Sequence, residues 1–291
     1  MRTVVKRAFS FLASALAIGV ITSNITAFAE TSSTNRIDLD DAYYGYLFQQ
    51  TGVTLYKLHE IETEQNVDLY DYFGVKEPSQ QKLEAWSTTP EGIEYSTGVS
   101  SNDGVSALST TNIDFSYSMP ITQWQSLRNI ADASDVLVTR DCTTLSIPHG
   151  HAALVYDSTM TVEHMGPTLL GIPGSTGKSV YTGISNVWSH CKSCRLYESP
   201  DARSEGVELD IAEYARGNLT GWSYNLLANK NSTSEVNCAT LVWKAYYWGG
   251  GITMNGVSGT NTIIPADFVE RNDLTMLFTV GWGHVNPHTW A

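Results

Sequence analysis

The spacing of apolar and polar residues predicts short strands in the middle of this chain. Two apolar runs, residues 151–156 and 160–165, flank the polar triplet 157–159, whose Asp and Ser are typical turn residues. Two such runs joined by a short turn predict a β-hairpin. Further short apolar runs predict strands at residues 135–139, 179–181 and 194–197.

Apolar residues three and four positions apart predict helices around these strands. The expected helices cover residues 38–50, 80–86, 124–131, 207–216 and 238–248. Three glycines, residues 249–251, end the last of them, because glycine commonly follows a helix. Strands that mostly follow one another, with helices at their flanks, predict an α+β fold in which an antiparallel sheet packs against helices.

The composition changes once along the chain. Residues 95–112 are rich in Ser, Thr, Gly and Asn and hold few large apolar residues, which is typical of a linker or a long surface loop. We therefore expect residues 30–112 to form an N-terminal region and linker of unknown role, either a propeptide or an accessory domain. Residues 113–291 are expected to form the main domain.

The first 29 residues have the pattern of a secretory signal peptide. Arg2, Lys6 and Arg7 precede an apolar run over residues 8–21, and Ala27-Phe28-Ala29 fits a cleavage site between small residues. The run is short for a membrane span, and no later stretch is long and apolar enough to cross a bilayer. We expect a secreted, extracellular protein whose mature chain begins at Glu30.

The charge of the chain argues against some classes of partner. The sequence has 17 Lys and Arg against 30 Asp and Glu, and removing the three basic residues of the leader lowers the net charge from −13 to −16. Such a surface repels nucleic acid and anionic lipid surfaces. We therefore expect neither nucleic acid nor a membrane span among its interactions.

Two residues mark a candidate nucleophilic site. Cys238 stands at the start of the expected helix 238–248, and His151 stands at the start of the expected strand 151–156. A helix N-terminus lowers the pKa of a thiol, and a nearby imidazole takes its proton, so the pair has what a cysteine nucleophile needs. A cysteine or histidine at such a position, taken alone, is more often part of a core. Trp188, Trp222 and Tyr224 are expected to be core or pocket wall.

The remaining cysteines leave two alternatives open. Cys142, Cys191 and Cys194 allow at most one disulfide if Cys238 is a free nucleophile, although four cysteines in an exported protein usually indicate two. The spacing of Cys191 and Cys194 suits a small disulfide loop or a pair of free thiols. Zinc held there with His190 is disfavoured, because a second CxxC or HxxxH motif is missing. We expect no metal and no cofactor.

Five segments in a fixed order resemble a known family. They are SDVLVTR at 134–140, GHAALV at 150–155, TVE at 161–163, NCATLVWKAY at 237–246 and IPADF at 264–268. The set resembles the permuted papain-like amidases, the YiiX-like relatives of the NlpC-type cell-wall cysteine peptidases, over about residues 115–280. In that family the histidine strand precedes the cysteine helix, because the fold is circularly permuted.

The resemblance implies roles for three residues: Cys238 as nucleophile, His151 as general base and Glu163 as the group that orients the imidazole. One departure is Ala239-Thr240 after the cysteine, where the family suggests Ser-Glu. Another is His164, which offers a rival third member of the site.

The parity of the hairpin loop decides between these two rivals. With a three-residue loop at 157–159, Ala153 faces Glu163, and Glu163 then shares a face with His151 while His164 points away. A two- or four-residue loop reverses this. We favour Glu163, because a carboxylate also stabilises the imidazolium that forms after proton transfer.

The resemblance implies a hydrolase that cleaves amide bonds, in peptides or acyl-amides, through a thioester intermediate. Export makes a peptidoglycan stem peptide a reasonable substrate, although no basic wall-binding repeat is visible in the sequence. Two alternatives remain: an acyltransferase on the same scaffold, and a binding module that has lost its activity.

Overall fold

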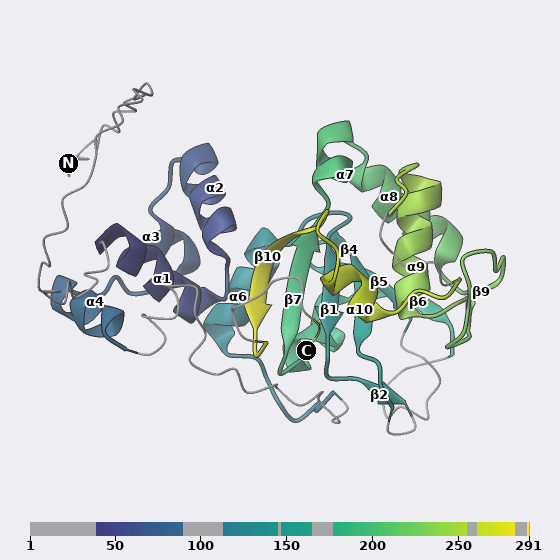
Figure 1. Ribbon diagram of the computed structural model, residues 1–291, viewed down its shortest axis with the longest axis horizontal. Helices are drawn as coiled ribbons and strands as arrows, with labels where there is room; N and C mark the ends of the chain where they lie inside the picture. Colours follow the sequence, from purple (N-terminus) through teal and green to yellow (C-terminus); the bar gives the residue numbers. More distant parts are fainter. Residues whose placement is uncertain are drawn as a thin grey trace, which may run out of the picture. The chain divides into compact units, whose positions relative to one another are not determined.

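The computed structural model describes residues 39–89, 113–144, 147–164, 177–254, 261–282 and Trp290. Its centre is a six-stranded sheet in which every neighbouring pair of strands is antiparallel. In spatial order (Figure 1) the strands are β10 (Thr275–Val280), β7 (Cys194–Glu198), β1 (Val136–Thr139), β4 (His151–Asp157), β5 (Met160–His164) and β6 (Ser179–Gly183). This confirms an α+β fold with an antiparallel sheet packed against helices.

The helices surround this sheet. They are α1 (Leu39–Thr51), α2 (Leu55–Gln65), α3 (Leu69–Phe73), α4 (Gln80–Ser87), α6 (Ile121–Ile130), α7 (Pro200–Glu205), α8 (Glu208–Tyr214), α9 (Cys238–Lys244) and α10 (Pro265–Val269). Among the described residues, no helix has both the length and the apolar character that a membrane span requires.

Helices α1, α4 and α6 lie where the periodicity predicts them. The predicted helices 207–216 and 238–248 are each a helix that continues into a π-helical turn, Ala215–Leu219 after α8 and Ala245–Gly249 after α9. The periodicity does not predict α2, α3, α7 or α10. The last three have five or six residues, too few to show a helical period.

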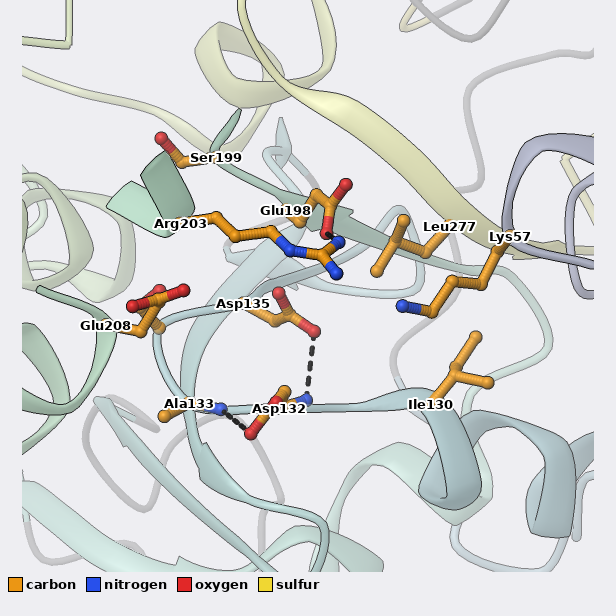
Figure 2. Close-up of a pocket in the computed structure, with 11 residues that line it drawn as sticks. Lys57, Ile130, Asp132, Ala133, Asp135, Glu198, Ser199, Arg203, Glu208 and Leu277 are labelled. Atoms are coloured by element: carbon orange, nitrogen blue, oxygen red, sulfur yellow. Dashed lines mark hydrogen bonds and ion pairs between the residues drawn. The ribbon is translucent and has the colours of Figure 1, made fainter. Parts of the chain in front are cut away.

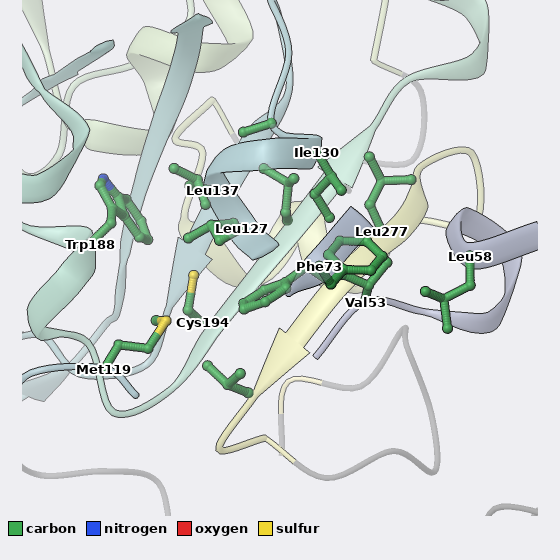
Figure 3. Close-up of a cluster of buried hydrophobic side chains, with 14 of the residues drawn as sticks. Val53, Leu58, Phe73, Met119, Leu127, Ile130, Leu137, Trp188, Cys194 and Leu277 are labelled. Carbon is green, nitrogen blue, oxygen red and sulfur yellow. The ribbon is translucent and has the colours of Figure 1, made fainter. Parts of the chain in front are cut away.

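The two faces of the sheet are covered by different helices. Along β4, Ala152 and Leu154 belong to one buried cluster together with side chains of α8 and α9, and we call this side the α9 face. Ala153 and Val155 belong to a second cluster with side chains of α1, α2 and α6, which we call the α6 face. Figure 3 shows this second cluster, with Trp188 among its members. Successive residues of a strand point to opposite faces, so the two clusters lie on either side of the sheet.

The described part of the N-terminal region shares its core with the sheet. The Thr54 N–H donates to the Leu277 carbonyl at 2.8 Å, Val53 forms a β-bridge with Phe278, and Leu58 is fully buried in the cluster of the α6 face. Residues 37–291 form one compact unit. The structure therefore differs from the expectation that residues 30–112 stand apart from the main domain. The expected leader and the expected linker at 95–112 lie outside the described residues.

The β4–β5 hairpin reaches the expected register by another route. Ala153 pairs with Glu163, as predicted, but Asp157 pairs with Met160 across a two-residue loop, and the ladder skips Tyr156. A two-residue loop alone would reverse the faces of β5. The bulge at Tyr156 adds one residue to β4 and restores the parity of the predicted three-residue loop.

The shared core predicts that a cavity in α2 destabilises the whole unit. We expect Leu58→Ala to lower the free energy of unfolding by about 2–5 kcal/mol, the usual range for removing a fully buried leucine. The far-UV circular dichroism of the helices and the near-UV circular dichroism of the tryptophans should both be lost at one shifted midpoint of unfolding.

Leu55→Ala is the matched control, because Leu55 lies on the same helix and is 40% exposed. A Leu58→Ala protein in which only the helical signal melts early would contradict the shared core.

Candidate active site

Asn237 fixes the start of the helix that carries Cys238. Its side-chain oxygen accepts from the Thr240 N–H at 2.6 Å, which caps α9. Its side-chain nitrogen donates to the carbonyls of Leu226 at 3.1 Å and Ile263 at 3.0 Å. Three hydrogen bonds of the Asn237 side chain therefore fix the start of α9. Cys238 is the first residue of this helix and is 5% exposed.

His151 is the first residue of β4 and is held by a carboxylate. Its Nε2 lies 2.7 Å from Oε2 of Glu163, and both side chains are buried. The Cys238 thiol lies near enough to the ring to help raise the pKa of the imidazole. Because Nε2 faces Glu163, Nδ1 is the nitrogen left for the thiol. The structure thus brings together all three residues singled out in the sequence.

The charge on His151 follows from these contacts. Burial lowers the pKa of the imidazole, but hydrogen bonds and electrostatic attraction to Cys238 and Glu163 outweigh burial and raise that pKa to about 10. An imidazole that stays protonated above neutral pH stabilises a thiolate beside it.

The site lies at the end of a strand, where the two faces of the sheet meet. His151 and Ala153 are two positions apart on β4 and share a face, and Glu163 pairs with Ala153. His151 and Glu163 therefore both lie on the α6 face. Cys238 begins α9, which covers the other face. His151 is the first residue of β4 and Cys238 the first residue of α9, so each lies at the end of its element.

Gly150 makes the sharp entry into β4. Its φ is +69°, and a Cβ at this position would lie 2.5 Å from the Thr139 carbonyl oxygen and 2.4 Å from the Trp290 ring. Its N–H donates to the Cys142 carbonyl at 3.0 Å. Only glycine fits this conformation and this spacing, so the glycine before His151 is required by the backbone.

Trp188 covers the imidazole from the α6 face. The rings of Trp188 and His151 are stacked, with centroids 5.6 Å apart and planes at 22°. Trp188 is fully buried. The sequence left open whether Trp188 is core or pocket wall, and the structure places it in the buried core of the α6 face.

Among the two rival residues of β5, Glu163 contacts His151 and His164 does not share its face. The His164 ring packs 4.8 Å from the Tyr224 ring, and burial lowers its pKa to about 4. A neutral imidazole on the α9 face has no charge with which to stabilise His151. The geometry therefore agrees with the choice of Glu163 as the partner of the imidazole.

The other cysteines have environments that disfavour the thiolate. Burial, with the charge of Cys238 and Asp141, raises the pKa of Cys142 to about 12. Burial raises the pKa of Cys191 and of Cys194 well above the ordinary range, and both thiols are free in the structure. Across the described residues, His, Cys, Asp and Glu side chains form no group of three or more that could hold a metal ion.

Sequence reasoning missed Thr161, which belongs to the same site. Its hydroxyl donates to Oε1 of Glu163 at 2.7 Å, and it is fully buried. A signal was present, because residues two apart on a strand share a face, and Thr161 precedes Glu163 by two. The capping role of Asn237 could also be expected from an asparagine directly before a predicted helix.

A pocket of about 90 Å³ lies at the opposite end of the central strands (Figure 2). It opens where β1 begins after Asp135 and β7 ends at Glu198, and burial raises the pKa of both carboxyls. Lys57 and Arg203 also line it, with Arg203 Nη1 3.3 Å from Glu198 Oε2. None of the residues around Cys238 lines this pocket. Lys57, Glu198 and Arg203 bring charged groups from α2, β7 and α7 to it.

Comparison with known proteins adds little to this geometry. No family model and no curated protein matches the chain. Among solved structures, the crystal structure of the metalloprotein yiiX from Escherichia coli O157:H7 is similar, with a TM-score of 0.37 and 13% identity over 50% of this chain and 96% of that chain. This is consistent with the YiiX-like resemblance of the motifs, but a similarity this weak supports no statement about fold or activity.

The geometry predicts that Cys238 is the most reactive thiol of the folded protein. The protonated imidazole of His151 and the N-terminus of α9 both favour the reactive thiolate form of a cysteine, whereas an ordinary thiol with a pKa of about 8.5 is almost fully protonated at pH 6. Brief iodoacetamide treatment followed by peptide mass spectrometry should place the first label on Cys238, and His151→Ala should slow it.

Cys142, Cys191 and Cys194 provide internal controls, since they should be labelled only after denaturation. Labelling of Cys142 ahead of Cys238 would refute the assignment.

Proposed function

We propose that this chain is an exported cysteine hydrolase that cleaves amide bonds. In this proposal Cys238 is the nucleophile, His151 the general base and acid, and Glu163 the group that orients and stabilises the imidazolium. The observation that carries the proposal is the 2.7 Å contact of the buried His151 ring with Glu163, beside a Cys238 thiol that also raises the pKa of the imidazole.

The proposed reaction has two steps. The Cys238 thiolate attacks the carbonyl carbon of the amide, His151 gives its proton to the leaving nitrogen, and the C–N bond breaks to leave a thioester on the sulfur. His151 then takes a proton from water, whose oxygen attacks the thioester carbonyl, and the C–S bond breaks to release a carboxylic acid and regenerate the thiolate beside the protonated imidazole. The anion that forms in each step needs donors, and the N–H groups of the first turn of α9 are the nearest candidates.

The buried state of His151 and Glu163 supports this chemistry. Electrostatic interactions are stronger where water is excluded, and Trp188 covers the ring on one side. Glu163 therefore favours the imidazolium form of His151, whose pKa is raised.

The substrate and the location of the reaction are also proposals. The order of the motifs favours amides of short peptides or acyl groups, and the leader pattern at residues 1–29 favours export. A peptidoglycan stem peptide meets both conditions. Nothing in the residues around Cys238 identifies the acyl group.

A simple activated ester tests the chemistry without knowledge of the substrate. With p-nitrophenyl acetate, the wild-type protein should release a stoichiometric burst of p-nitrophenol and carry an acetyl group on Cys238, located by peptide mass spectrometry. Cys238→Ala should abolish both. Glu163→Gln should lower the rate by about 10²-fold, because the imidazolium loses its counter-charge.

His164→Gln is the matched control, since it changes the neighbouring residue on the opposite face and should leave the burst rate within about threefold. Acetylation of a residue other than Cys238, or a larger loss in His164→Gln than in Glu163→Gln, would contradict the proposal.

A further inference from the structure

We propose that Thr161 is a positioning residue for this site, whose hydroxyl fixes the Glu163 carboxylate in the orientation that accepts the hydrogen bond of His151. The inference rests on the function proposed above. It adds a fourth member to the chain of contacts, which then runs from Thr161 through Glu163 and His151 to Cys238.

The geometry shows where the hydroxyl hydrogen goes. Two acceptors lie near Thr161 Oγ1: Oε1 of Glu163 at 2.7 Å and the Thr182 carbonyl oxygen at 3.5 Å. A hydroxyl has one hydrogen, and a charged acceptor at the shorter distance forms the stronger bond. The hydroxyl therefore donates to Glu163, whose other oxygen accepts from His151 at 2.7 Å.

Each oxygen of Glu163 then has one donor, and both are needed because the residue is fully buried. A buried carboxylate stays ionised only when hydrogen bonds and nearby positive charge replace water. Within the described residues, His151 is the cationic partner of Glu163, so the Thr161 hydroxyl is the second source of stabilisation.

Removing this hydroxyl should act on His151 as well as on Glu163. A carboxylate that has lost one donor holds its own proton more tightly and rotates more freely, and it then stabilises the imidazolium less. Other titratable groups near the ring are Cys238, His149 and His164, while Cys191 faces Glu163. None of these carries the positive charge that could take the place of the hydroxyl bond.

The test uses Thr161→Val, which keeps the shape of the side chain and removes the hydroxyl, in the full-length protein. The pKa of His151 is followed by NMR titration of its imidazole protons, assigned with His151→Gln. We expect Thr161→Val to lower this pKa by about one unit and to slow the acetylation burst of Cys238 with p-nitrophenyl acetate by about tenfold, because a carboxylate that rotates freely orients the imidazole less well.

Two further variants separate positioning from general stability. Thr161→Ser restores a hydroxyl and should return both values to within about twofold of wild type. Thr279→Val removes the hydroxyl of another buried threonine, on β10, and should change neither value. If Thr161→Val is too unstable to fold, Thr161→Cys, which keeps a weak donor of similar size, should give an intermediate shift.

The outcomes distinguish this inference from the proposed function. A wild-type protein with an ordinary His151 pKa and an unreactive Cys238 overturns the proposed function. A wild-type protein with a raised pKa and a reactive Cys238, and a folded Thr161→Val protein that keeps both, overturns the role of Thr161 alone.

Discussion

The pairing register of β4 with β5 is the constraint on which the site depends. Strand residues alternate between the faces, so a shift by one residue would turn Glu163 away from His151 and bring His164 in its place. The bulge at Tyr156 sets that register. A backbone irregularity at the far end of the hairpin thus decides whether a carboxylate or a neutral imidazole meets the candidate general base.

The sequence predicted the class of the fold well, but it predicted the individual helices less well. Long runs with a clear period, such as α6 and the β4–β5 hairpin, lie close to where they were expected, and so does α1, whose period is weak. Short helices were missed because one or two turns hold too few apolar residues to show a period. The division at residue 112 failed for a different reason: a local change of composition says nothing about contacts as distant as the one between Thr54 and Leu277.

The site was predictable in its members and not in its surroundings. Cys238, His151 and Glu163 each follow a local signal, namely a helix start, a strand start and a face set by parity, and the structure brings them into contact. The stacking of Trp188 on His151 depends on how separate segments pack, which no local pattern reports. The predicted pairing of Glu163 with Ala153 came through a three-residue loop, whereas the structure reaches it with a two-residue loop and a bulge.

The docking of the first helices on the last strand has a consequence for the order of folding. Thr54 bonds to Met276, 222 residues further along the chain, so the core of the α6 face closes only when β10 has emerged from the ribosome. Until then the apolar sides of α1 and α2 lack the part of their core that β10 supplies, and contacts of such long range form slowly. A chain built in this way cannot complete the core of the α6 face until its synthesis is nearly finished.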